Sequence, residues 1–313
     1  MKQQYSARIK VTSRSFSRHP VLKQELLELF PNSVFNTDGP PTGLSNIVEF
    51  INNADGMILG LEEMDRPVFE QLKNLKIVAK YGVGLDNLDV NAAEELNISV
   101  GWTGGVNKRS ASEQALGFML GLSRNLFFSA FPLKNGKWEK EGGSFLTGKT
   151  VGIIGCGHIG TDLIYLLQPF NCQILICDIL DKSGVVDTYE ATQVLQDELL
   201  AEADIISLHV PLTKLTQGMV NEEFLQKMKS TAHLINNSRG PVVEQQALKN
   251  ALQQNIIAGA ALDVFESEPP DYLEFLGLPN LMVTPHLGGS ANEAILAMGR
   301  SAINHLKRYF QNV

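Results

Sequence analysis

The chain has 313 residues, of which 44% are hydrophobic and 19% are charged, and its formal net charge is −8. At ~100–200 residues per domain, this length predicts two domains. The acidic balance argues against a protein that binds nucleic acid through a broad basic face. The ordinary apolar content, without a low-complexity tract, argues against disorder.

Three cysteines, Cys156, Cys172 and Cys177, have no metal-ligand spacing, so they predict neither a disulfide framework nor a metal site. The first twenty residues lack the apolar segment of a signal peptide. No stretch approaches the ~18 uninterrupted apolar residues that a bilayer span requires. We therefore expect a soluble, cytoplasmic protein without a membrane or nucleic-acid partner.

Short strand-like segments alternate with amphipathic helical patterns in the first third of the chain. The expected strands are residues 7–13, 33–37, 56–60, 76–82 and 98–102. Parallel strands need crossover helices between them, so this alternation predicts one open parallel sheet.

A second strand–helix series follows a long helical pattern, roughly Ser110 to Leu133, and the polar loop 135–143. Its expected strands are residues 150–155, 173–178, 204–210, 232–238, 256–264 and 281–286. A C-terminal helix is expected from Ser290 to Phe310. The fold class is therefore α/β, with two doubly wound parallel-sheet domains.

The second series begins with a dinucleotide-binding fingerprint, in which Gly155, Gly157 and Gly160 form a G-x-G-x-x-G between a strand and a helix. The first glycine permits the tight turn, the second lets the backbone approach a pyrophosphate, and the third lets helix and strand pack closely. The free N–H groups at the helix N-terminus would bind the phosphates. These features predict a Rossmann domain.

Asp178 ends the next expected strand, 18 residues after Gly160, close to the spacing of a ribose-binding acid. Its carboxylate should accept hydrogen bonds from a ribose 2′-OH and repel a 2′-phosphate. The next basic residue along the chain is Lys182. The sequence therefore favours NAD over NADP as the cofactor.

Three ionisable residues end later strands of the same series: Arg239, Glu268 and His286. The carboxyl ends of parallel strands meet at one edge, where ligands bind. Each residue alone is more often a surface or structural group. Together they would supply a cation for a substrate carboxylate, an acid–base group and a carboxylate that tunes it.

The motifs LDVFESEPP, INNSRG, HVPLT and TPHLGGS, behind GCGHIG, resemble those of the D-isomer-specific 2-hydroxyacid dehydrogenases, most closely the phosphoglycerate dehydrogenase-like branch. KYGVGLDNLDV and NGKWEKEGGSFLTGKTVGIIG also match in order, so the resemblance covers nearly the whole chain. It implies a Rossmann NAD-binding domain and a smaller, flavodoxin-like substrate domain.

The resemblance implies a catalytic role for each of the three strand-end residues. His286 would exchange a proton with the substrate oxygen, Glu268 would raise the pKa of His286, and Arg239 would bind the substrate carboxylate. The backbone amides of Val83 and Gly84 would bind the same carboxylate from the other domain.

The resemblance also implies a cofactor site built from several loops. The residues beyond the three glycines would be His158, Ile159, Asp178, Val210, Pro211, Asn237, Asp263 and Gly289, with Asp263 at the nicotinamide carboxamide.

The family fold implies that the C-terminal helix returns to the first domain. The substrate domain would then comprise residues 1–103 plus 290–313, and the NAD-binding domain residues 104–289. Members are commonly homodimers joined through the long helix and the NGKW loop.

One departure from the phosphoglycerate dehydrogenase pattern concerns the phosphate. Gly60 stands where an Arg is usual, and two acidic residues, Glu62 and Glu63, follow it. The basic residues that could substitute for this Arg are Lys80, Lys108 and Arg109.

Three interpretations remain open. The first is an NAD-dependent D-2-hydroxyacid dehydrogenase acting on a small 2-hydroxy acid or 2-oxoacid, with 3-phosphoglycerate as the leading substrate. The second is an NAD-sensing, corepressor-like interaction protein. The third is a glyoxylate or hydroxypyruvate reductase.

Overall fold

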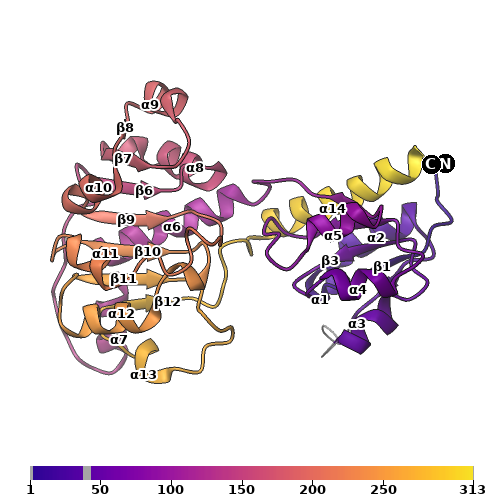
Figure 1. Ribbon diagram of the computed structural model, residues 1–313. Helices are drawn as coiled ribbons and strands as arrows, with labels where there is room; N and C mark the ends of the chain where they lie inside the picture. Colours follow the sequence, from indigo (N-terminus) through magenta and orange to yellow (C-terminus); the bar gives the residue numbers. More distant parts are fainter. Residues whose placement is uncertain (1–2, 38–43, 313) are drawn as a thin grey trace. The chain divides into compact units, whose positions relative to one another are not determined.

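The computed structural model describes residues 3–37 and 44–312 (Figure 1). The chain forms two compact units. One comprises Met1–Asn107 together with Ala291–Val313, and the other is Lys108–Ser290. Both units are α/β structures built on a parallel sheet, as the sequence predicts.

The described residues of the first unit form a five-stranded parallel sheet in the order β2-β1-β3-β4-β5. This is the flavodoxin-like order, in which the direction of strand addition reverses between β1 and β3. The strands are β1 (Ile9–Val11), β2 (Val34–Phe35), β3 (Gly56–Leu59), β4 (Ile77–Lys80) and β5 (Ser99–Gly101).

Helices cover both faces of this sheet. Alternate residues of a strand point to opposite faces, so Met57 and Leu59 of β3 pack with one set of helices while Ile58 packs with the other. The first set is α3 (Leu44–Ile51), α4 (Arg66–Gln71) and α5 (Val90–Glu95). The second set is α1 (Arg14–Arg18), α2 (Pro20–Leu29) and the C-terminal α14 (Asn292–Gln311).

The second unit contains, among its described residues, a seven-stranded parallel sheet in the order β12-β11-β10-β9-β6-β7-β8. In Figure 1 these strands follow one another from β8 at the top to β12 at the bottom. This is the Rossmann order extended by one strand, with its switch point between β6 and β9. The strands are β6 (Thr150–Ile154), β7 (Gln173–Cys177), β8 (Thr192–Gln193), β9 (Ile205–Leu208), β10 (His233–Asn236), β11 (Gly259–Leu262) and β12 (Leu281–Val283).

Two helical layers enclose the larger sheet. One layer comprises α6 (Lys108–Ser123) and α8 (His158–Leu167), and the other comprises α10 (Gln196–Glu202), α11 (Glu222–Lys227), α12 (Gln245–Gln253) and α13 (Leu273–Leu276). The remaining helices are α7 (Leu126–Lys134), α9 (Ser183–Tyr189), and the 3₁₀ turns η1 (Gln168–Phe170) and η2 (Gly240–Val242).

The single long helix expected from Ser110 to Leu133 is wrong, because α6 and α7 meet at a 67° bend. Asn125, between them, adopts the left-handed conformation with φ 50°, which commonly ends a helix. A carbonyl at the end of α6 is satisfied from outside the helix, since Ser123 O accepts from the amide of Ser144 at 2.7 Å. The apolar periodicity continues through this break, so the sequence pattern alone does not reveal it.

No single helix in the described part of the chain is long and apolar enough to cross a membrane. Only the bent pair α6 and α7 passes that test, by length and composition.

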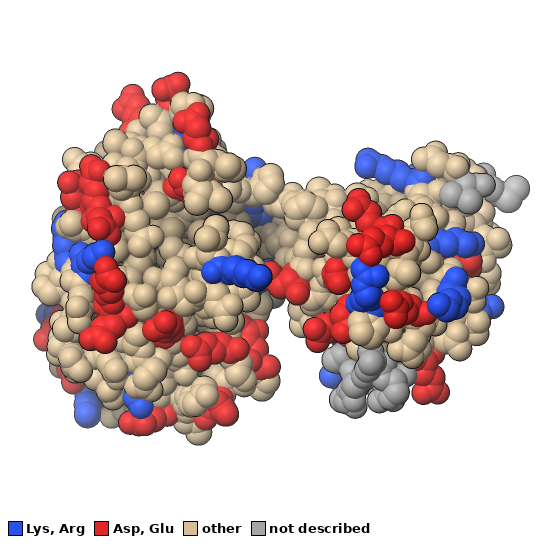
Figure 2. All heavy atoms as spheres, in the orientation of Figure 1, with Lys and Arg blue, Asp and Glu red and all other residues tan. Residues whose placement is uncertain are grey.

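On the face drawn in Figure 2, Lys and Arg side chains lie scattered among Asp and Glu.

We expect Gly299 of α14 to be required for packing in the first unit. A Cβ at Gly299 would lie 2.3 Å from Cδ1 of the fully buried Leu22 in α2. Gly299→Val should therefore destabilise the protein by about 1–3 kcal/mol, measured by urea unfolding. The matched helical control is Gly117→Ala, whose Cβ would meet nothing within 4 Å. Equal stability of the two variants would contradict this packing.

Candidate active site

Three ionisable side chains lie at the carboxyl ends of the adjacent strands β10, β11 and β12. Arg239 precedes η2, Glu268 lies in the loop after β11, and His286 follows β12. His286 Nδ1 and Glu268 Oε2 are 2.7 Å apart, and the other carboxylate oxygen of Glu268 accepts the amide of Phe265 at 3.1 Å. The structure thus brings the predicted His–Glu pair together.

Hydrogen bonding, charge and burial shift the pKa values of His286 and Glu268 in this group. The hydrogen bond to Glu268 raises the pKa of His286 above its usual value, against the opposing effect of burial. Burial would raise the pKa of Glu268, but the hydrogen bond and charge of His286 outweigh it and hold that pKa below its usual value. Arg239 lowers both pKa values through its charge. An imidazolium–carboxylate pair is therefore favoured.

The turn that carries His286 is fixed by Asp263, the residue just after β11. His286 has a positive φ of 53°, which is uncommon for a residue with a side chain. The Asp263 carboxylate has no solvent exposure and accepts Thr284 Oγ1 at 2.5 Å and the amides of Leu287 and Gly288 at 2.7 Å each. Asp263 therefore holds both ends of the His286 turn.

Helix α6 extends this hydrogen-bond network. Gln114 Nε2 donates to Thr284 Oγ1 at 3.2 Å, and Gln114 Oε1 accepts Asn237 Nδ2 at the same distance. Asn237 Nδ2 also donates to Ala111 O at 2.8 Å, whereas its buried Oδ1 has no partner among the described residues. A buried acceptor of this kind is normally satisfied, so Asn237 Oδ1 is an exception within this network.

The dinucleotide loop has the backbone geometry that the fingerprint predicts. Gly155 has φ +88°, and a Cβ there would lie 2.6 Å from His209 O. A Cβ at Gly160 would lie 2.5 Å from Gly155 O, whereas one at Gly157 would meet nothing within 4 Å. Gly157 therefore leaves open space at the N-terminus of α8, whose first two residues are His158 and Ile159.

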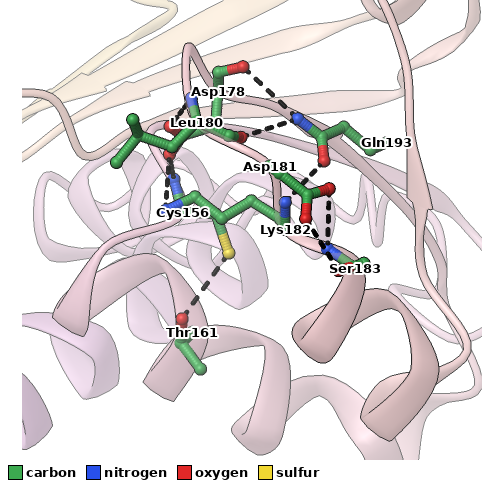
Figure 3. Close-up of polar contacts among 8 residues, drawn as sticks. All are labelled: Cys156, Thr161, Asp178, Leu180, Asp181, Lys182, Ser183 and Gln193. Carbon is green, nitrogen blue, oxygen red and sulfur yellow. Dashed lines mark hydrogen bonds and ion pairs between the residues drawn. The ribbon is translucent and has the colours of Figure 1, made fainter.

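Asp178 lies just after β7 and faces this loop (Figure 3). Its two carboxylate oxygens accept the amides of Cys156 and Leu180, each at 2.8 Å. Lys182 Nζ lies 3.3 Å from Asp178 Oδ2, a contact that the sequence argument did not anticipate. Burial raises the pKa of the neighbouring Cys156 thiol, so Cys156 is a neutral packing residue here.

The other expected cofactor residues follow neighbouring strands. Val210 is half-buried and Pro211 is exposed just beyond β9, and Gly289 lies in the loop after β12. Since β9 and β6 flank the switch point, Val210 and Pro211 stand at the edge where a dinucleotide binds in this topology. The arrangement fits a dinucleotide. Among the described residues, no group of three or more His, Cys, Asp and Glu could hold a metal ion.

In the first unit, the expected substrate residues Val83 and Gly84 lie in the loop after β4. Trp102 Nε1 donates to Val83 O at 3.0 Å. The backbone N–H groups of Val83 and Gly84 have no acceptor within the described part of this unit. They are therefore suitably placed donors for an anionic ligand of this loop.

The basic residues considered as phosphate ligands already have protein partners. Lys80 is buried, and its Nζ donates to Gly60 O and Asn87 Oδ1 at 2.6 Å each. Arg109 forms a two-point ion pair with Asp162, at 2.8 and 3.0 Å, and Lys108 lies 4.0 Å from the same carboxylate. The idea that these residues replace a phosphate-binding Arg is therefore not supported.

The structure leaves little space for a side chain at Gly60, where an Arg is usual in phosphoglycerate dehydrogenases. A Cβ there would lie 3.0 Å from Ser13 Cβ. Glu62 is buried with its carboxylate turned to Thr12 Oγ1 and Gly60 N, at 2.5 and 3.2 Å. This segment is internally bonded and presents no phosphate-binding cation.

Together, the Rossmann sheet, the dinucleotide loop and the His–Glu pair with its adjacent Arg define an NAD-dependent dehydrogenase. The sequence profile for the NAD binding domain of the D-isomer specific 2-hydroxyacid dehydrogenases matches residues 116–288. The chain belongs to the D-isomer-specific 2-hydroxyacid dehydrogenase family, and its second unit contains the family's NAD-binding domain.

Individual relatives make the comparison more specific. A glyoxylate reductase of Thermofilum pendens is 37% identical over 280 residues, 86% of this chain and 82% of the relative. A D-3-phosphoglycerate dehydrogenase of Methanocaldococcus jannaschii is 36% identical over 85% of this chain, but this chain spans only 52% of that protein. The solved NADPH-dependent glyoxylate/hydroxypyruvate reductase of Sinorhizobium meliloti is 29% identical with a TM-score of 0.84, covering 98% of this chain and 94% of that one.

These comparisons favour the glyoxylate or hydroxypyruvate reductase interpretation over 3-phosphoglycerate dehydrogenase, which was the leading one from the sequence. They give no support to a corepressor-like interaction protein. The chain is an NAD-dependent oxidoreductase of this family.

The pKa shifts of the His–Glu pair predict how the folding stability of the protein depends on pH. The contribution of His286 to folding is complete below its unfolded-state pKa, about 6.5, and is lost as the pH rises through the raised folded-state value. The contribution of Glu268 is present above its unfolded-state pKa, about 4.3, and is lost as the pH falls through the lowered folded-state value. Both contributions are complete between about pH 4.3 and 6.5.

We therefore expect Glu268→Gln to lower the pKa of His286, because the main cause of its increase is removed. An NMR titration of the His286 ring, assigned by comparison with His286→Asn, measures this. Glu266→Gln is the control, since Glu266 accepts the amide of Gln245 instead. An unchanged His286 pKa in Glu268→Gln would refute the pairing.

Proposed function

We propose that this protein reduces a small, unphosphorylated 2-oxoacid, glyoxylate or hydroxypyruvate, to the corresponding 2-hydroxy acid with NADH. The observation that carries this proposal is that the three basic residues considered as phosphate ligands lie against protein partners. Lys80, Lys108 and Arg109 are each engaged with a protein carboxylate, amide or carbonyl. The Thermofilum relative, named a glyoxylate reductase, supports the same substrate class.

In this proposal His286 is the proton donor. Because Nδ1 is bonded to Glu268, the proton on Nε2 is the one available to a substrate carbonyl oxygen. The hydrogen bond to Glu268 raises the pKa of His286, which favours the protonated form that a general acid requires. Glu268 fixes the orientation of the ring and stabilises the imidazolium.

Arg239 is the proposed carboxylate ligand. A guanidinium can donate two parallel hydrogen bonds to a carboxylate, which orients the 2-oxoacid as well as binding it. Its positive charge also polarises the adjacent carbonyl carbon toward hydride, which bound NADH supplies. The backbone N–H groups of Val83 and Gly84, in the unit that we assign as the substrate domain, are the proposed donors of that unit to an anionic substrate.

Three further residues complete the proposed cofactor site. Asp178 would bind the adenosine ribose, and Asn237 Oδ1 would accept a donor of the nicotinamide half. A carboxylate has room for a fourth hydrogen bond, so Asp263 can still receive the carboxamide in addition to its three protein donors.

We expect NADH oxidation to be fast with glyoxylate or hydroxypyruvate and at least about tenfold less efficient, as kcat/KM, with phosphohydroxypyruvate. The physical reason is that a phosphate dianion would be desolvated without a cation to receive it.

His286→Ala should lower kcat by ~10²–10⁴ with little change in NADH affinity. Efficient use of phosphohydroxypyruvate, or full activity of His286→Ala, would overturn the proposal.

We also propose that the protein is a homodimer joined through α7 and the loop that follows it. No described residue of α7 is buried, although the helix is rich in large apolar side chains. The exposed apolar side chains on this surface are Leu126, Phe131, Leu133, Trp138 and Phe145, each more than half exposed. An apolar patch of this kind is typical of an interface, and the family resemblance supports a second copy as its partner.

Phe131→Asp combined with Trp138→Ser should give a monomer, because a buried charge would replace apolar contact in the proposed interface. Light scattering coupled to size-exclusion chromatography measures this. Leu195→Asp, which changes an even more exposed leucine outside α7 and its following loop, should leave the dimer intact. A monomeric unaltered protein would exclude the dimer.

A further inference from the structure

Figure 3 shows a loop, residues 178–183, whose polar groups bond to one another, to Cys156 and to Gln193. Asp178 and Lys182 form an ion pair at 3.3 Å, with side chains only 10% and 15% exposed. Asp178 is the proposed ribose-binding acid, so the ammonium of Lys182 lies next to the ribose-binding carboxylate. The charge of Asp178 is therefore partly neutralised where a 2′-phosphate would arrive.

The backbone of this loop is fastened to β8 by Gln193. Gln193 Oε1 accepts the amide of Lys182 at 2.8 Å, and its Nε2 donates to Leu180 O at 2.9 Å. Asp181 further stiffens the loop by accepting Ser183 Oγ at 2.8 Å. Lys182 is thus held close to Asp178 through its backbone, and its ammonium lies at the end of a flexible four-carbon stem.

The outer side of the loop is open to solvent. Ile179 is 91% exposed and Leu180 is 62% exposed, directly beside Asp178. Large apolar side chains are usually buried, so these two provide a surface against which an adenosine can pack.

We propose that Lys182 is a cofactor-specificity residue, whose ammonium pairs with Asp178 when NADH is bound and contacts the 2′-phosphate when NADPH is bound. Lys182 then lets the enzyme accept NADPH better than a lone ribose-binding acid permits, although Asp178 still favours NADH. The proposal rests on Asp178 being the ribose-binding residue of the NAD site. It involves no covalent step, only an exchange of one ion pair for another.

The test is the dissociation constant of NADH and of NADPH, measured by quenching of protein fluorescence without substrate. Lys182→Met should weaken NADPH about tenfold and NADH by less than about threefold, because a charge-assisted contact is lost only with NADPH. Lys182→Arg should keep NADPH binding. Lys229→Met, which breaks a comparable pair with Asp204 at 3.1 Å, is the matched control and should change neither constant.

A double-mutant cycle separates this role from a merely structural one. Asp178→Ser should weaken NADH and tighten NADPH, since Lys182 is released from its partner, and Asp178→Ser with Lys182→Met should lose that gain. Equal weakening of both cofactors by Lys182→Met, or a gain in NADPH affinity that persists in the double variant, would overturn the proposal. If the unaltered protein binds neither cofactor, the proposed cofactor site itself is wrong.

Discussion

The buried carboxylate of Asp263 is the constraint on which the geometry of the proposed active site depends. A buried charge is costly unless hydrogen bonds compensate it, and here a hydroxyl and two backbone amides do so, all from residues 284–288. Relaxing this turn would leave the carboxylate without donors. The turn can therefore keep His286 at a positive φ, an unfavourable conformation that persists only when its surroundings enforce it.

The close approach of the loops after β10 and β11 is a second constraint on the geometry of the proposed active site. The loops after β10 and β11 are so near that a Cβ at Gly240 would lie 1.8 Å from Phe265 O. The amide of Phe265 in turn holds one oxygen of Glu268 at 3.1 Å. Because Gly240 follows Arg239 directly, the same approach brings the guanidinium near enough for its charge to influence Glu268 and His286. The absence of a side chain at Gly240 thus lets Arg239 lie near the Glu268–His286 pair.

The sequence predicted the two parallel sheets and the strand-end positions of Arg239, Glu268 and His286, because strand periodicity and local motifs are encoded over short segments. It did not predict the bend at Asn125, since apolar spacing continues across it. It also gave no sign of Gln114, a polar residue of α6 that bonds both Thr284 and Asn237. Contacts between residues more than a hundred positions apart follow from the tertiary fold rather than from local pattern.

The sequence does not reveal which groups a lysine side chain contacts in the folded protein. Lys80 and Lys182 both lie near proposed ligand sites, yet their surroundings differ. Recruiting Lys80 to a substrate would break two hydrogen bonds of 2.6 Å, to Gly60 O and Asn87 Oδ1. Lys182 would exchange one contact of 3.3 Å with a carboxylate that keeps two backbone donors. The cost of changing partners, rather than the presence of a basic residue, therefore determines which lysine can influence ligand choice.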